Sequence, residues 1–101
     1  MVVAPNALAQ YRVKGETAIE PDDSTKIEIR KAKLDRVVAS LKLCVDVTGT
    51  VQEVTLLKSS NFAAYDAKLS REIAKWEYSP YQVDGHAVPV CTAVTFVYTQ
   101  H

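Results

Sequence analysis

Hydrophobic and polar positions alternate over residues 36–47, and this period of two predicts a long β-strand with one buried face. Thr48 and Gly49 follow as a turn, where glycine supplies the positive φ of a tight hairpin. A second strand is predicted over residues 51–57, and one bulge near the turn would let Val51, Val54 and Leu56 all face the core. The inward positions of the first strand are Val37, Ala39, Leu41, Leu43, Val45 and Val47.

A second pattern, with helical spacing, follows Ser59, Ser60 and Asn61, which are typical capping and turn residues. Large apolar residues recur there at the spacing of one helix face, with Asp66 in the first turn. They are Phe62, Tyr65, Leu69, Ile73 and Trp76. We expect this helix to pack against the strand face that carries Leu41, Leu43 and Val45.

In the first 20 residues, no helical or strand period continues for more than a few positions. Residues 1–20 are predicted to be a linker or N-terminal arm, with a short edge strand over residues 11–13, and residues 21–101 to be the domain. Residues 21–25 resemble a helix start, and residues 26–34 fit a short helix with Ile27, Leu34 and the stems of Arg30 and Lys31 inward. A strand over residues 27–29 is the alternative. The basic residues near the end of this segment are interpreted as a solvated face.

A third strand is predicted after the Asp84–Gly85 turn, over residues 88–98. Its inward positions are Val90, Thr92, Val94, Phe96 and Tyr98. Both cysteines then face outward. If this strand pairs antiparallel with the first and Cys44 lies opposite Cys91, Lys42 lies opposite Ala93 and Asp46 opposite Pro89. Directly opposed residues are within disulfide range, so we favour a Cys44–Cys91 disulfide, and hence an oxidising compartment, over two free thiols.

Composition narrows the possible functions. The chain has 101 residues, enough for one domain, and a formal net charge of zero, which gives no electrostatic reason to bind nucleic acid. It has no apolar run near 18 residues and no secretory signal pattern at its start. His86 is interpreted as a solvated loop residue. We expect no catalytic group, metal or cofactor, and no enzymatic activity; a cysteine-dependent hydrolase is the alternative if the thiols are free.

Several motifs occur together in a fixed order. They are the V-D-x-x-G-x-V hairpin at residues 45–51, S-x-N-F followed by Y-D at residues 59–66, W-x-Y-x-P at residues 76–80 and D-G-x-x-V-P-V at residues 84–90. Their order and spacing resemble the C-terminal domain of the TonB family of periplasmic energy transducers, over about residues 36–98. The cysteines are not part of that family's general pattern. The resemblance implies an α+β fold, a three-stranded antiparallel sheet with helices packed on one face, with Val54 and Leu56 inward.

The resemblance also implies a function. TonB-like proteins are anchored in the inner membrane and end in a periplasmic domain of this kind. Such domains bind an extended peptide of an outer-membrane partner along the last strand, by β-augmentation, and an inner-membrane motor supplies the force. On this chain the partner-binding edge would consist of Val90, Thr92, Ala93, Val94, Thr95, Phe96, Val97 and Tyr98. The edge could instead be covered by the N-terminal arm or a second copy. The alternative function is a structural coupling module of another trans-envelope machine, for motility or secretion.

Overall fold

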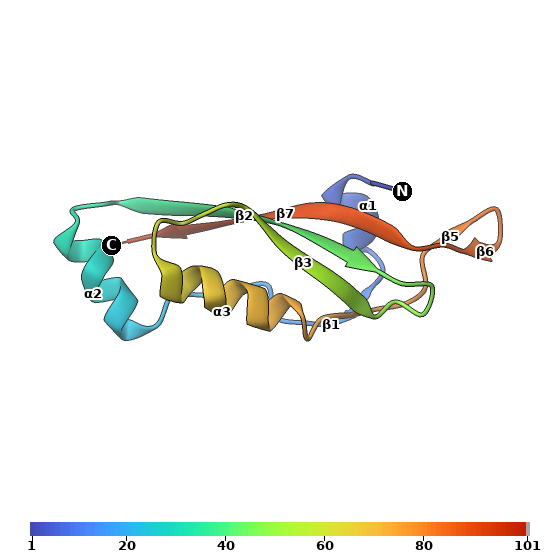
Figure 1. Cartoon of the computed structure of the whole chain (residues 1–101), viewed down its shortest axis with the longest axis horizontal. Helices are drawn as coiled ribbons and strands as arrows, with labels where there is room; N and C mark the ends of the chain where they lie inside the picture. The colour runs from blue at the N-terminus through green and yellow to red at the C-terminus, as the bar shows by residue number, and fades with distance from the viewer. Residues whose placement is uncertain (101) are drawn as a thin grey trace.

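The computed structural model describes residues 1–100 and is built around an antiparallel sheet of three strands in the order β3–β2–β7 (Figure 1). The molecule is elongated, with extents of 51 × 20 × 19 Å. The fold is α+β. The elements are α1 (Pro5–Ala9), β1 (Arg12–Lys14), α2 (Asp23–Lys31), β2 (Arg36–Val45), β3 (Val51–Lys58), α3 (Ala63–Ile73), β4 (Glu77–Tyr78), β5 (Gln82–Val83), β6 (His86–Ala87) and β7 (Val90–Thr99).

The two long strands, β2 and β7, pair without interruption from Arg36 opposite Thr99 to Val45 opposite Val90. The register is the predicted one, because Cys44 lies opposite Cys91 and Lys42 lies opposite Ala93. The pairing stops at Val45, so the predicted opposition of Asp46 and Pro89 is not formed. This register places the alternating apolar residues of both strands on one face of the sheet.

The core lies between that face and α3. The buried side chains of β2 are Val37, Ala39, Leu41, Leu43 and Val45, as the alternation predicts. The helix contributes Tyr65, Leu69 and Ile73, and Trp76 follows it, so four of the five predicted stripe residues are buried. Phe62 is the N-cap residue of α3 and packs at the margin of the core. Removal of this apolar surface from water is the main favourable contribution to folding.

The turn after β2 corrects the prediction for Val47, which is exposed rather than inward. Asp46 accepts hydrogen bonds at Oδ1 from the backbone N–H groups of Thr48 and Thr50, at 2.9 and 3.0 Å. These bonds fold the chain into a turn one residue after the strand ends, so the period of two is lost before Val47. Gly49 has a φ of +88° within this turn, as expected for a tight hairpin.

The predicted bulge near the turn is confirmed, because Cys44 lies opposite Glu53 while the next residue, Val45, lies opposite Val51. Val51 and Val54 are half-buried against the core. Leu56 lies opposite Leu41 but is exposed, because β3 is an edge strand and its far half is only partly covered. Leu56 therefore faces the predicted side of the sheet, the side of Leu41, but its side chain is not buried there.

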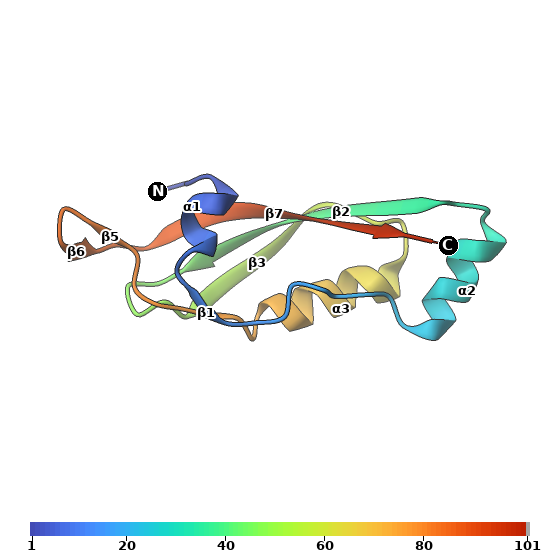
Figure 2. The same cartoon turned by 180° about the vertical axis from the view of Figure 1, so that it is seen from behind.

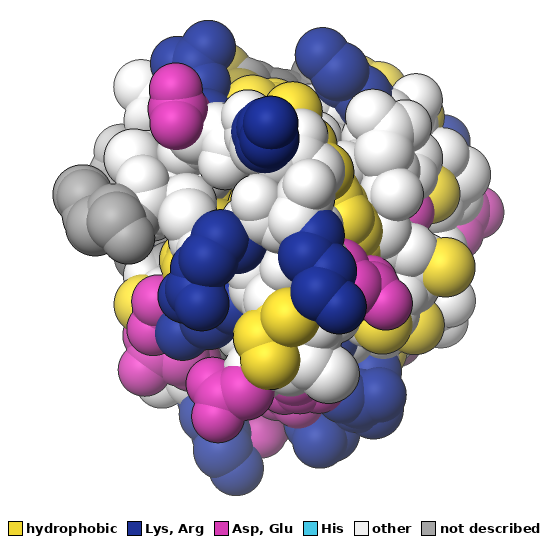
Figure 3. All heavy atoms as spheres, turned by 90° about the vertical axis from the view of Figure 1, so that its left-hand side faces the viewer, with side chains coloured by type: hydrophobic (Ala, Val, Ile, Leu, Met, Phe, Trp, Pro, Cys, Tyr) yellow, Lys and Arg dark blue, Asp and Glu magenta, His cyan; other side chains and the backbone are white. Residues whose placement is uncertain are grey.

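The segment after Pro21 is a helix, α2, and not the alternative strand. Its inward face was predicted wrongly: Thr25 and Ile29 are buried, whereas Ile27 and Leu34 are exposed. Residues 25 and 29 are one helical turn apart and define an inward face different from that of Ile27. At this end of the molecule, basic side chains are interspersed with acidic and apolar ones and form no single patch (Figure 3).

Residues 1–20 follow the sheet and contribute two core side chains, Leu8 and Ile19. The short strand β1, near the predicted residues 11–13, pairs antiparallel with β4. Figure 2 shows the segment between β1 and α2 passing along α3 on the side of the molecule where β7 lies. This segment forms one wall of the groove described next.

Candidate functional site

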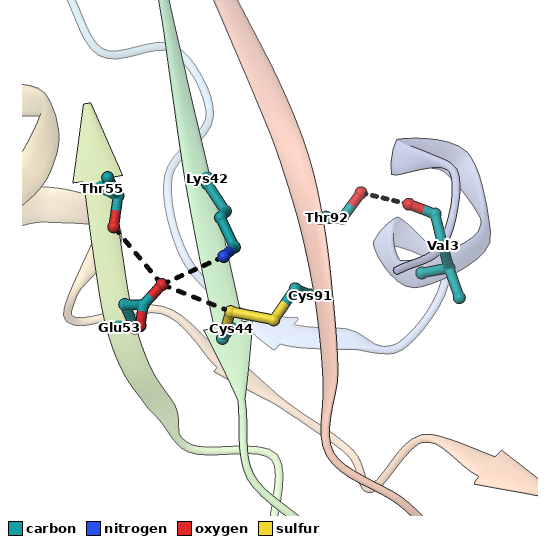
Figure 4. The surroundings of a disulfide bond; sticks show 7 residues. All are labelled: Val3, Lys42, Cys44, Glu53, Thr55, Cys91 and Thr92. Carbon is teal, nitrogen blue, oxygen red and sulfur yellow. Dashed lines mark hydrogen bonds and ion pairs between the residues drawn. A yellow bond between two sulfur atoms is a disulfide. The ribbon is translucent and has the colours of Figure 1, made fainter. Parts of the chain in front are cut away.

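The predicted disulfide between Cys44 and Cys91 is present, on the sheet face opposite α3 (Figure 4). The Cα atoms of the two cysteines are 4.0 Å apart. The backbone of Cys91 points away from β2: its N–H donates to Met1 O at 2.8 Å, and its C=O accepts from Val3 N–H at 2.9 Å. Cys44 and Cys91 are therefore a non-hydrogen-bonded pair of the ladder, in which opposed side chains come closest.

This orientation determines which backbone groups of β7 face outward. Directions alternate along a strand, so the N–H and C=O groups of Ala93, Thr95, Val97 and Thr99 point the same way as those of Cys91. Gln100 N–H donates to Asp35 O at 2.7 Å, which confirms that the other parity faces β2. Within residues 1–100, those four residues have no hydrogen-bond partner on their outer side.

The N-terminal residues cover only the beginning of this edge. Val2 forms a parallel bridge with Cys91, and Thr92 Oγ1 donates to Val3 O at 2.8 Å. The alternative that the arm covers the edge thus holds for the part of β7 near Cys91. From Ala93 to Thr99 the outward backbone groups of β7 have no hydrogen-bond partner among the described residues, although α1 contacts the strand; we call this stretch the free edge.

A groove of about 480 Å³ borders the free edge. One wall is β7 from Thr95 to Thr99, and the other is the segment from Thr17 to Glu20. Tyr65 also lines the groove. A second hollow of about 220 Å³ adjoins the first, and Thr17, Thr95 and Phe96 line both. The other residues that line the second hollow are Pro5, Arg12, Trp76 and Val94. We call the two hollows together the edge groove.

The wall opposite β7 is held in place by α3. Tyr65 Oη donates to Ile19 O at 2.8 Å, and Lys68 Nζ donates to Glu20 O at 2.7 Å. Lys68 also forms an ion pair with Asp22 at 2.9 Å, and its hydrogen bond lowers the pKa of Asp22. Burial raises the pKa of Tyr65, so its hydroxyl remains a donor at neutral pH. The groove therefore has two fixed walls.

The predicted edge residues fall into two sets. Val90, Thr92 and Phe96 are buried, with Val94 and Tyr98 partly buried beside them, on the core face. Ala93, Thr95 and Val97 are exposed on the outer face, and Ser40 and Thr95 share a hydroxyl hydrogen bond of 3.0 Å there. A strand added to this edge would continue both faces, with its own alternate side chains over the core and over the outer face.

Sequence reasoning missed the opposite wall and Arg12. Arg12 lies on β1, and its guanidinium stacks on the Trp76 ring, 5.1 Å from the centroid. The only local signal for this contact was the possible edge strand over residues 11–13; nothing in the spacing connects Arg12 with Trp76.

The other candidate residue from the sequence, His86, does not line the edge groove. His86 is exposed in the β5–β6 hairpin. Within residues 1–100, no three His, Cys, Asp or Glu side chains gather as a metal site would require, and no helix is long and apolar enough to cross a membrane.

Comparison of the chain with models of known protein families and with curated proteins found no match. The resemblance to the TonB C-terminal domain therefore stays a prediction that depends on the motifs described above.

Proposed function

We propose that this chain is a non-enzymatic peptide-binding module that takes up an extended segment of a partner protein as an additional strand on the edge of β7. The observation that carries the proposal is the free outer side of Ala93, Thr95, Val97 and Thr99, bordered by the edge groove. In β-augmentation, such backbone groups provide affinity and the neighbouring pockets provide selectivity.

The character of the edge supports this proposal. Natural proteins protect exposed edges with charged side chains, proline or bulges. The stretch from Ala93 to Thr99 contains no charged residue and no proline, and its pairing with β2 has no bulge. An edge of this kind is prone to pair with another chain, so a specific partner strand explains why it is left open.

For the biological setting, we propose a TonB-like role in the bacterial cell envelope. The partner is then a peptide of an outer-membrane protein, and the module transmits force from an inner-membrane motor during transport. The motif order in residues 36–98 supports this reading. The Cys44–Cys91 disulfide supports a periplasmic location, since disulfides persist in oxidising compartments.

A titration with a selected peptide tests the binding site. Extended peptides are selected from a synthetic library on the immobilised protein, and one is titrated into isotope-labelled protein while amide shifts are recorded. We expect the largest shifts, and new protection from hydrogen exchange, at Ala93, Thr95, Val97 and Thr99. Failure to select any peptide, or shifts confined to other elements, would refute the proposal.

Val97→Pro provides a sharper test, with Val97→Thr as the matched control. Proline removes one outward N–H while leaving the β2 ladder intact, whereas threonine keeps that N–H. We expect Val97→Pro to weaken peptide binding at least about tenfold, and Val97→Thr to change it little. Equal binding by both variants contradicts the edge-strand mode. If a second copy occupies the edge instead, the wild type sediments as a dimer that Val97→Pro dissociates.

A further inference from the structure

The edge groove is closed at the end near Ala93. There the chain's own Met1 and Val3 hold the backbone of Cys91, and Thr92 Oγ1 holds Val3 O. Pro5 follows as the first residue of α1 and lines the groove at this end. A strand added to the edge therefore cannot continue along the sheet beyond Ala93.

The closed end carries a positive charge. Arg12 lines it, half-buried, with its guanidinium oriented by the ring of Trp76. Among residues 1–100, none of the ion pairs involves Arg12; Glu77, which is next to its strand partner Tyr78, pairs instead with Lys14 at 3.5 Å. A guanidinium offers several N–H donors in a fixed plane, a geometry that matches a carboxylate.

We propose that the edge groove captures a free C-terminus, with the terminal carboxylate of the partner peptide bound by Arg12 at the closed end. This inference rests on the proposed peptide-binding function. It adds the class of ligand, which is a chain end and not an internal segment. The direction follows as well, because a C-terminus near Ala93 requires the peptide to run antiparallel to β7.

Three observations favour this ligand over others. An internal segment has to leave the groove at its closed end, where Pro5 and the Met1–Val3 segment already occupy the space. A peptide running parallel to β7 would bring its amino end, and often a positive charge, toward Arg12. The antiparallel direction also matches the pairings of β2 with β3 and with β7, and antiparallel pairing is slightly more stable than the parallel kind formed by the Val2–Cys91 bridge.

The experiment compares how two pools of peptides bind to the full chain, and the peptides of both pools have the same length. One pool presents random extended peptides with free C-terminal carboxylates, and the other presents the same peptides as C-terminal amides. We expect selection from the free-acid pool, with at least about tenfold weaker binding when a selected peptide is amidated. Extension of that peptide by several residues at its C-terminus is expected to weaken binding as strongly.

Variants at Arg12 test whether this residue causes the preference for the free acid over the amide. Arg12→Gln is expected to remove the difference between acid and amide, and Arg12→Lys to keep part of it. Arg30→Gln, on the exposed side of α2, is the matched control and should retain the full difference. Thermal unfolding of each variant shows that the fold is intact.

The outcomes separate the two proposals. If peptides from both pools bind equally at the β7 edge, end capture is wrong while peptide binding stands. If the preference for the free acid persists in Arg12→Gln, Arg12 is not the carboxylate site. If neither pool binds, the proposed function itself fails, and this inference with it.

Discussion

Removal of the disulfide should have a large and calculable effect on stability. Cys44 and Cys91 are separated by 47 positions, and in the chain-entropy model a cross-link closing a loop of that length contributes about 4 kcal/mol at 25 °C. Both side chains lie half-buried on the outer face, so replacing them with alanine removes little core packing. We therefore expect Cys44→Ala/Cys91→Ala to lose about 4 kcal/mol of unfolding free energy. That is a large share of the roughly 5–15 kcal/mol typical of a domain.

Urea unfolding followed by circular dichroism measures this loss. The matched control is Ser40→Ala/Thr95→Ala, which removes a non-covalent cross-strand pair from the same two strands and the same face. We expect the control to lose about 1 kcal/mol or less, because a partly exposed hydroxyl pair has little net value. Reduced wild-type protein should unfold like the double alanine variant.

Equal losses in the cysteine and control variants would refute the reasoning. That result would mean that the cross-link does not restrict the unfolded chain, or that the unfolded chain already holds the two strands together. A changed slope of the unfolding free energy against urea concentration would identify the second case, because this slope reports the surface exposed on unfolding.

Two further predictions concern the turn and the start of α3. Gly49→Ala should destabilise the fold by about 1–3 kcal/mol in urea unfolding, because a Cβ there would lie 1.9 Å from Tyr78 O at a φ of +88°. Burial favours the neutral form of Asp66, but hydrogen bonds from Ser59 and Ser60 outweigh it and lower its pKa. The charged carboxylate therefore stabilises the fold above the unfolded pKa of about 3.9, and this stability is lost as pH falls through the lower folded pKa. Asp66→Asn should flatten the acid side of a stability–pH profile; an unchanged profile contradicts the role of these bonds.

Much of the sheet and of α3 could be predicted because local periodicity reports burial directly. Residues Val37 through Val45 alternate over nine positions, and matching parity in β2 and β7 was enough to predict the disulfide. The failures lie where another interaction competes with periodicity. Asp46 accepts hydrogen bonds from the backbone of the turn, so the strand ends before Val47. The sequence of α2 allows two inward faces, and only tertiary packing decides between them.

The candidate site was predictable only on its β7 side. The free edge follows from the composition of the last strand, but the opposite wall comes from residues 17–20, about 75 positions earlier in the chain. The contacts that place that wall, from Tyr65 to Ile19 and from Lys68 to Glu20, span 46 and 48 positions. No periodicity within residues 1–20 encodes such contacts, so Arg12 and this wall became visible only in the fold.

The position of the disulfide also has a mechanical consequence. β2 and β7 run along the long axis of the molecule, and the hydrogen bonds between antiparallel strands lie across that axis (Figure 1). A pull along β7 therefore loads its bonds to β2 together in shear and does not peel them apart one by one. The covalent bond at Cys91, near the beginning of β7, prevents the strand from sliding one register past β2. The sheet therefore resists a pulling force most strongly along the direction of β2 and β7.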